Sequence, residues 1–163
     1  MKVEIQPVLD YLNSLGIEYG FAEHPAVHTI SEMMELGLEN EDEVAKNLFL
    51  RDSKKKHYFL ITLDQRKSAN LRELSGILGV KGLTFASEAD LMKYLALERG
   101  AVTPLGVLND EERAVTVVLD RAVLGYRSIG VHPNVNTASL WLKPNDLVRA
   151  VEHHGNKIII MDM

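Results

Sequence analysis

The stretch Val44-Ala45-Lys46-Asn47-Leu48-Phe49-Leu50-Arg51-Asp52 has the composition of a β-strand, with a lysine and an amide side by side near its start. The rest of the run is apolar nearly throughout, as expected of a strand. A lysine ammonium is costly to bury unless it has a partner or faces a polar cleft. Two interpretations of Lys46 are therefore open: its side chain simply reaches solvent, or it belongs to a functional site.

The sequence around this stretch predicts a hairpin within an α+β domain. Lys54–Lys56 would turn the chain into a second apolar run, His57–Leu63, and the two runs would pair as antiparallel strands. We expect further strands at 18–23, 83–86, 114–119, 138–142 and 157–161, and helices at 3–15, about 29–36, 71–78, 88–97 and 144–154. These elements predict one domain over residues 1–163, with a mixed, mostly antiparallel sheet and flanking helices.

Length and composition are those of a single globular domain. The chain has 163 residues, of which 46% are hydrophobic and 25% charged. No run approaches the roughly 18 apolar residues of a membrane span, and the first twenty residues lack a signal-peptide pattern. The absence of cysteine excludes disulfides, thiol nucleophiles and zinc–thiolate sites. We therefore expect a cytoplasmic protein without a membrane partner.

The charge distribution is uneven although the formal net charge is -5. Residues 1–44 carry one basic and ten acidic side chains, whereas residues 46–82 carry nine basic and three acidic ones. A local basic surface can attract a polyanion even on an acidic protein. The alternative is that the lysine run is only a solvated hairpin turn. The candidate contacts to a polyanion are Lys54, Lys55, Lys56, Arg66 and Lys67.

The histidine spacing does not indicate a metal site, and two common catalytic motifs are absent. His24 and His28 are four residues apart, but Pro25 between them argues against a shared helical face, so we expect no metal. His153 and His154 would lie near a helix end, where they meet the helix dipole favourably. Neither a Gly-x-Ser-x-Gly elbow nor a phosphate-binding Gly-x-x-x-x-Gly-Lys loop is present. An enzyme of this kind would work by positioning and electrostatics.

Three short polar segments, called polar islands below, stand out in apolar surroundings. His24-Pro25 and then Thr29 come before them in the sequence. The polar islands are Lys46-Asn47 within Ala45-Lys46-Asn47-Leu48-Phe49-Leu50, the loop Gly100-Ala101-Val102-Thr103-Pro104-Leu105-Gly106, and the run His132-Pro133-Asn134-Val135-Asn136-Thr137. In this order and separation they resemble the YbaK/ProX family of aminoacyl-tRNA editing proteins, relatives of the domain inserted in bacterial prolyl-tRNA synthetases. The resemblance covers nearly the whole chain. The Lys-Asn pair and the His-Pro-Asn run are most similar to the freestanding branch that removes alanine from mischarged proline tRNA.

The chain departs from the family pattern at two positions. Leu105 stands where phenylalanine is expected in the loop, and Val131 stands before the histidine where an aromatic residue is common. Both changes alter the expected pocket size, so the choice between alanine and cysteine as substrate stays open. An unrelated small-molecule hydrolase on the same fold is a further alternative, because fold does not fix function.

The resemblance implies hydrolysis of the aminoacyl ester on the terminal adenosine of mischarged tRNA(Pro), most of all Ala-tRNA(Pro). A bound water would attack without a committed protein nucleophile, with the tRNA ribose hydroxyl as a candidate helper. Lys46 and Asn47 would hold the adenosine and its phosphate, loop N–H groups would meet the ester carbonyl, and His132 would border the aminoacyl pocket. The implied catalytic residues are Lys46, Gly100 and His132, and the implied substrate-binding residues are Thr29, Asn47, Ala101, Val102, Thr103, Pro104 and Asn136.

The resemblance also implies which partners and cofactors to expect. Mischarged tRNA(Pro) would be the main partner, with prolyl-tRNA synthetase as a candidate transient one. No cofactor and no DNA partner are implied. The alternatives within the same fold are a Cys-tRNA(Pro) deacylase and a non-catalytic module that binds the tRNA end.

Overall fold

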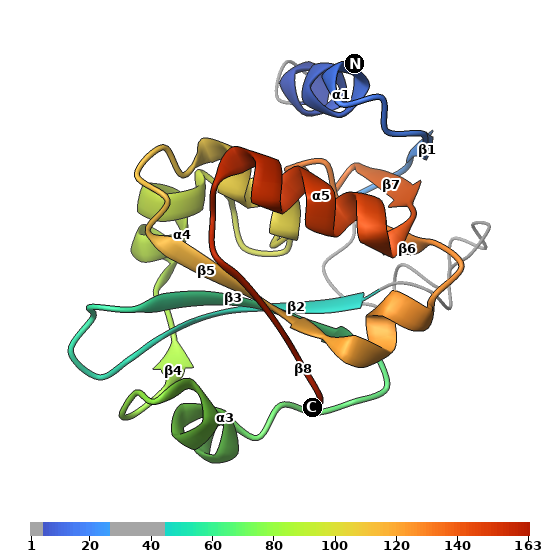
Figure 1. Cartoon of the computed structure of the whole chain (residues 1–163). Helices are drawn as coiled ribbons and strands as arrows, with labels where there is room; N and C mark the ends of the chain where they lie inside the picture. Colours follow the sequence, from blue (N-terminus) through green and yellow to red (C-terminus); the bar gives the residue numbers. More distant parts are fainter. Residues whose placement is uncertain (1–4, 27–44) are drawn as a thin grey trace.

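The computed structural model describes residues 5–26 and 45–163, which form two β-sheets with helices packed around them (Figure 1). The first sheet has five strands in the order β4-β2-β3-β5-β8, namely β4 (Thr84–Phe85), β2 (Ala45–Arg51), β3 (Tyr58–Asp64), β5 (Val115–Asp120) and β8 (Ile158–Met161). The second has three strands in the order β1-β7-β6, namely β1 (Tyr19–Glu23), β7 (Ala138–Leu142) and β6 (Ile129–Val131).

The predicted α+β class and the predicted hairpin are confirmed. β2 and β3 pair as antiparallel strands, with Lys46 opposite Leu63 and Asn47 opposite Thr62. β3 pairs in parallel with β5, and β5 with β8, whereas the other pairings are antiparallel. The sequence predicted one sheet, and the structure divides the strands between two. Strand periodicity shows which residues are extended, but it does not show which strands become neighbours.

Helices cover both sheets, and several of their ends follow the predicted signals. The helices are α1 (Ile5–Ser14), α3 (Leu71–Leu78), α4 (Glu88–Leu95) and α5 (Pro144–His154), with 3₁₀ turns η2 (Pro104–Asn109) and η3 (Arg121–Gly125). The Asn70 side chain accepts a hydrogen bond from the Glu73 N–H, and Gly79 ends the helix at a φ of 72°. α4 ends two residues earlier than predicted, because Ala96 adopts a left-handed φ of 53°. The helix expected at about 29–36 lies outside the described residues.

The five-stranded sheet is covered on both faces. Leu50 packs with Leu74 of α3, whereas Phe49 packs with Leu91 of α4 and Val151 of α5. Figure 1 accordingly shows α3 on one side of this sheet, and α4 and α5 on the other. Since successive side chains of a strand point to opposite faces, each residue of β2 belongs to one side or the other.

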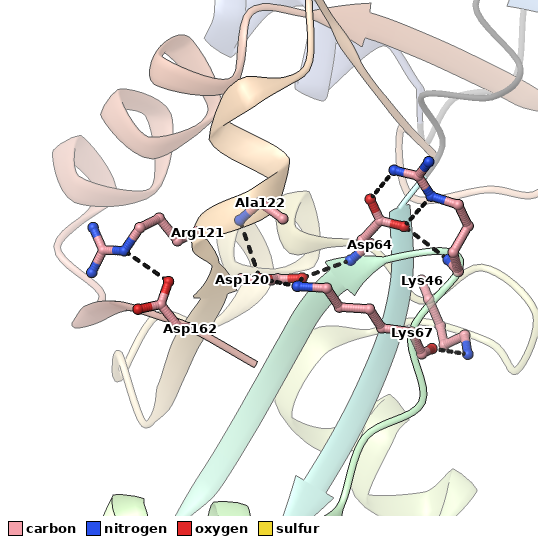
Figure 2. Close-up of polar contacts among 8 residues, drawn as sticks. Lys46, Asp64, Lys67, Asp120, Arg121, Ala122 and Asp162 are labelled. Atoms are coloured by element: carbon pink, nitrogen blue, oxygen red, sulfur yellow. Dashed lines mark hydrogen bonds and ion pairs between the residues drawn. The ribbon is translucent and has the colours of Figure 1, made fainter.

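A buried polar cluster closes one end of the five-stranded sheet, where β3 and β5 end (Figure 2). Asp64 and Asp120 are 3% and 0% exposed. Asp120 accepts hydrogen bonds from the peptide N–H groups of Asp64 and Ala122, both at 3.1 Å, and pairs with the Lys67 ammonium at 3.0 Å. Arg66 donates to both carboxylate oxygens of Asp64, at 2.9 and 2.8 Å.

These contacts shift the pKa values of Asp64 and Tyr126. The hydrogen bonds from the Arg66 guanidinium hold the pKa of Asp64 well below its usual range, against the opposing effect of burial. Burial raises the pKa of Tyr126, and the hydrogen bond to Asp64 raises it further. Asp64 therefore stays ionised in the folded protein to a lower pH than in the unfolded chain.

We expect Asp64→Asn to lower the free energy of unfolding by about 2 kcal/mol at pH 7, the scale of charge-assisted hydrogen bonds. The folded pKa of Asp64 is depressed, so its stabilisation is fully present above the unfolded carboxyl pKa of about 3.9 and is lost as the pH falls through the folded pKa. Urea unfolding of both proteins at about pH 7 and about pH 2.5 measures the difference, which should shrink on acidification.

The matched control is Asp162→Asn. Asp162 pairs with Arg121 at 3.1 Å, but its side chain is 87% exposed, so its loss should change stability little at either pH. A stability difference for Asp64→Asn that stays constant between the two pH values would contradict the assignment.

Candidate active site

The side chains of Lys46 and Asn47 lie on opposite faces of the five-stranded sheet. Asn47 shares a face with Phe49, on the side of α4, and accepts a hydrogen bond from the Thr62 hydroxyl at 2.8 Å. Lys46 shares a face with Leu48 and Leu50, on the side of α3. The sequence predicted that both residues line one site, and strand alternation separates them.

Lys46 is held by the segment that follows β3. Its ammonium donates to the carbonyl oxygen of Lys67 at 2.6 Å, and the Lys67 ammonium is itself paired with buried Asp120 (Figure 2). The half-buried Lys46 ammonium therefore has the partner it needs, the Lys67 peptide carbonyl. The ion pair between Lys67 and Asp120 fixes that carbonyl in place. One hydrogen bond leaves the ammonium two further hydrogens to donate.

The predicted Gly100–Gly106 loop has a compact internal structure. Gly100 has a left-handed φ of 91°, Ala101 N–H donates to Glu98 O at 3.1 Å, and Gly106 N–H donates to Thr103 O at 3.0 Å. In the described part of the chain, the peptide N–H groups without an acceptor in this loop are those of Gly100, Val102 and Thr103. The sequence predicted hydrogen-bond donors in this loop without naming them, and these three N–H groups are now the candidates.

Several residues of this loop serve packing. Ala101, Thr103, Pro104 and Leu105 are all buried. A Cβ on Gly106 would lie 2.6 Å from Leu97 Cδ1, so this glycine permits the close packing of η2. The sequence predicted that the glycines let the backbone approach a ligand. At Gly106 the group that approaches is Leu97.

The loop is tied directly to His132. The Thr103 hydroxyl donates to the His132 carbonyl at 2.7 Å and accepts from the Leu105 N–H at 3.3 Å. Thr103 is fully buried, so its side chain is used in joining the two predicted islands. Asn136 lies half-buried in the turn between β6 and β7.

His132 is held as a neutral imidazole with a defined tautomer. Its Nδ1 lies 2.9 Å from the Ala138 carbonyl oxygen, which only accepts, so Nδ1 carries the proton and Nε2 is free to accept. Burial lowers the pKa of His132, and neighbouring His24 lowers it further, although the Ala138 hydrogen bond opposes the shift. A neutral histidine in this position can accept a proton at physiological pH.

His24, which was not among the predicted site residues, belongs to the same region. The two imidazole rings are 6.2 Å apart between centroids. His24 Nε2 lies 2.8 Å from the Ser139 hydroxyl, and its Nδ1 lies 2.8 Å from the Pro25 carbonyl oxygen. The His24-Pro25 pair was the available sequence signal for this neighbourhood.

A pocket of about 450 Å³ opens beside β2, between its outer edge and α4. Its wall is mostly apolar with a few polar groups, an arrangement typical of small-molecule sites. Asn47 and Val102 both line the pocket, so the pocket joins two of the three predicted polar islands. Neither His132 nor Lys46 lines it. The lining residues are Asn47, Leu48, Phe49, Phe85, Ala86, Ser87, Glu88, Leu91, Arg99 and Val102.

Sequence reasoning missed part of this wall. Phe85, Glu88 and Arg99 come from β4, α4 and the segment before the Gly100 loop, and no motif marked them. Composition could have drawn attention only to Phe85, because a phenylalanine in a two-residue strand has few neighbours to cover it. Predicted Thr29 lies outside the described residues, so its position relative to the pocket stays a prediction.

The predicted basic surface is divided between the two ends of the hairpin. Lys54, Lys55 and Lys56 are exposed in the turn between β2 and β3, about 20 Å along the strands from the far end. Arg66 and Lys67 follow β3 at that far end and are paired with Asp64 and Asp120. Contact of these side chains with tRNA stays a prediction. In the structure they form two separate regions, one at each end of the hairpin.

Substituting alanine for Lys54, Lys55 and Lys56 tests the turn region. If these lysines contact phosphates, tRNA binding weakens and the slope of log affinity against log salt becomes shallower by about one per lost contact. Filter binding across a range of salt concentrations measures the slope. Lys143→Ala, another exposed lysine, is the control; an unchanged slope in the triple variant would assign the turn lysines to solvent.

Two further structural findings concern metals and membranes. Among residues 5–26 and 45–163, no group of three or more histidine, aspartate or glutamate side chains comes together that could hold a metal ion. Within those same ranges, no helix has the length and apolar character needed to cross a bilayer.

Comparison with known proteins identifies the family. Residues 24–150 match the model of the aminoacyl-tRNA editing domain. The chain is 44% identical over 151 residues to the prolyl-tRNA editing protein ProX of Acetoanaerobium sticklandii, covering 93% of this chain and 92% of the relative. It is 39% identical over 154 residues to prolyl-tRNA synthetase associated domain-containing protein 1 of Danio rerio, covering 93% and 83%.

A solved structure described as a candidate trans-editing enzyme for prolyl tRNA synthetase has the same fold. It superposes with a TM-score of 0.76 at 19% identity, covering 100% of this chain and 99% of that one. The matched family model and the 44% identical relative define the class of protein, an aminoacyl-tRNA deacylase, and the structure gives it an α+β fold. The chain belongs to the aminoacyl-tRNA editing domain family, as the sequence predicted.

Proposed function

We propose that this protein is a trans-editing hydrolase that removes alanine from mischarged tRNA(Pro). The observation that carries the proposal is that Asn47 of β2 and Val102 of the Gly100–Gly106 loop line one pocket. Thr103, the next residue of that loop, bonds the backbone carbonyl of His132, which brings the histidine segment beside the loop. Similarity to relatives named for prolyl-tRNA editing supports the choice of tRNA(Pro).

The proposed reaction needs no protein nucleophile. Water attacks the ester carbonyl carbon and forms the new C–O bond, and the bond from that carbon to the ribose oxygen then breaks. The ribose oxygen leaves with a proton, so that the products are free alanine and tRNA with an intact terminal hydroxyl. The N–H groups of Gly100, Val102 and Thr103 are the candidate donors to the developing oxyanion, and one such donor is worth about 3 kcal/mol.

His132 supports this reaction as a neutral acceptor beside the aminoacyl group. Its Nδ1 proton is committed to Ala138 O, which leaves the Nε2 lone pair for the attacking water or the substrate ammonium. The lowered pKa of His132 keeps that lone pair available at and below neutral pH.

Lys46 has a different proposed role, as a cation for the phosphate of the terminal nucleotide. Its side chain lies on the other face of the sheet from Asn47, so it would reach tRNA at the end of β2 and not inside the pocket. A charge at that place orients the substrate, and misplacement of a substrate lowers the chemical rate as well as binding.

We expect Lys46→Ala to lower single-turnover deacylation of Ala-tRNA(Pro) at least tenfold while the protein stays folded, because one cation at the substrate would be lost. Rapid-quench measurement of the rate, with the urea unfolding midpoint recorded alongside, separates activity from stability. Lys81→Ala, an exposed lysine outside the site, is the control. Near wild-type rates for Lys46→Ala would remove Lys46 from the site.

Discrimination by size decides the substrate. A larger apolar side chain normally binds more tightly in a roomy pocket, by about 1–3 kcal/mol per methylene at most, so rejection of proline needs steric exclusion. We expect the aminoacyl group to lie at the Val102 end of the site, in a space that admits a methyl group and clashes with a pyrrolidine ring. Alanyl-tRNA(Pro) should be hydrolysed and prolyl-tRNA(Pro) largely spared.

Parallel rates with alanyl, cysteinyl and prolyl esters on the same tRNA test this expectation. The reactions include EDTA, because the proposed chemistry uses no metal. Faster release of cysteine than alanine would make the protein a cysteine-clearing enzyme. Ready release of proline would contradict exclusion by size, and no release of any amino acid would leave a binding module.

A further inference from the structure

His24 is the first residue after β1, and both nitrogens of its imidazole ring have hydrogen-bond partners. Nδ1 lies 2.8 Å from the Pro25 carbonyl oxygen, which only accepts, so Nδ1 carries the proton. In the neutral ring Nε2 is therefore an acceptor, and the Ser139 hydroxyl, 2.8 Å away, donates to it. Ser139 is 2% exposed, so this bond is shielded from water, which strengthens it.

These contacts hold the first residues of β7 on both sides of Ala138. The His24 N–H donates to the Thr137 carbonyl at 2.9 Å, and the His24 ring bonds Ser139. Ala138 itself pairs with Glu23, the last residue of β1. The bond to Thr137 extends the β1–β7 ladder by one residue, whereas the bond to Ser139 is a side-chain contact that the ladder does not supply.

The carbonyl group of Ala138 is the group that sets the tautomer of His132. Its oxygen lies 2.9 Å from His132 Nδ1, which donates to it. The hydrogen bond made by one ring nitrogen decides which nitrogen of a neutral histidine carries the proton. If this carbonyl turned away, Nε2 of His132 would carry the proton part of the time. Only the tautomer with the proton on Nδ1 offers the Nε2 lone pair.

The two imidazole rings are close neighbours, with centroids 6.2 Å apart and planes inclined by 52°. Both His24 nitrogens already have partners, Pro25 and Ser139. His24 therefore reaches His132 through Ser139 and the Ala138 peptide group, and not by a bond between the rings.

We infer that His24 is a positioning residue: through Ser139 it holds the Ala138 carbonyl against His132 Nδ1 and so keeps the Nε2 lone pair of His132 available. This inference rests on the proposed function, since it takes His132 Nε2 as the acceptor in the reaction. The hydrogen bonds that carry it involve only residues of the chain.

The first experiment records the ¹⁵N NMR signals of the His132 ring at about pH 8, where an ordinary histidine is neutral. Loss of the signals in His132→Gln assigns them. Wild type should show a protonated Nδ1 and an unprotonated Nε2. In His24→Phe, which keeps a ring but removes both nitrogens, the two shifts should move toward each other, as in a mixture of tautomers. His24→Gln should retain the wild-type pattern, because its side-chain oxygen can accept from Ser139.

The second experiment measures deacylation of Ala-tRNA(Pro), with the urea unfolding midpoint recorded for each variant. His24→Phe should lower kcat about tenfold and leave KM unchanged, because a displaced proton acceptor slows the chemical step without weakening binding. Ser139→Ala removes the same hydrogen bond from the other side and should cause the same loss. The double variant should lose no more than either single variant, since both act through one contact.

His153→Phe is the matched control, because His153 is an exposed histidine of α5 whose Nδ1 lies 3.3 Å from the Tyr11 hydroxyl. It should change neither the His132 signals nor kcat. Unchanged His132 signals in folded His24→Phe and Ser139→Ala would overturn the inference, as would additive losses in the double variant. If His24→Phe does not fold, Ser139→Ala decides the matter alone.

The NMR signals keep this test separate from the proposed reaction. If the signals change as expected but wild type releases no alanine, His24 does hold the tautomer of His132 and the proposed function fails. If wild type releases alanine while the signals stay the same in both variants, the proposed function stands and the role of His24 is wrong.

Discussion

The arrangement of the site depends on the ion pair between Lys67 and Asp120. Asp120 is fully buried where β5 ends, and it gathers the Lys67 ammonium and the peptide N–H groups of Asp64 and Ala122. A buried carboxylate without these partners would be strongly destabilising, so the segment after β3 has little freedom to move away. Its Lys67 carbonyl in turn accepts a hydrogen bond from the Lys46 ammonium, so the fold itself fixes the cation that is proposed to meet the tRNA phosphate.

Strand alternation then divides the proposed site between two faces of one sheet. Asn47 points toward α4 and the Gly100–Gly106 loop, whereas Lys46 points toward the side of α3. This division suits a substrate with a neutral end and a charged backbone. The nucleoside and its ester would enter the apolar pocket, where a phosphate would be costly to desolvate, while the phosphate would stay at the sheet end near the ammonium.

The local elements were predictable from the sequence because their signals are local. Asn70 and Gly79 bound α3, and Pro144 and Gly155 bound α5, as the capping residues indicated. The pairing of β1 with β7 joins segments more than a hundred residues apart, and no periodicity specifies it. For the same reason the division into two sheets was missed. The 3₁₀ turn η2 was missed although its signals are local, namely Thr103 as the capping residue and Pro104 in the first turn.

The site was predicted as a set of residues but not as a geometry. The Lys-Asn pair, the loop and His132 were identified through family resemblance, and Thr103 does join the last two. The opposite orientations of Lys46 and Asn47 follow from simple alternation and could have been predicted. The pairing of Lys67 with buried Asp120 depends on the end of β5, far along the chain, whereas Arg66 pairs with Asp64, only two residues away. Phe85 carries no motif, and only its exposure beside a pocket distinguishes it.

The central claim is that the pocket beside β2 is where the aminoacyl end of tRNA binds. The most direct measurement is NMR titration of the ¹⁵N-labelled protein with adenosine that carries alanine through a non-hydrolysable 3′-amide. The account predicts saturable shifts of the Asn47 side-chain amide and of the Val102 and Phe85 peptide signals, with the signals of the Lys54–Lys56 turn unchanged. Saturable binding that leaves Asn47 and Val102 unshifted would contradict it.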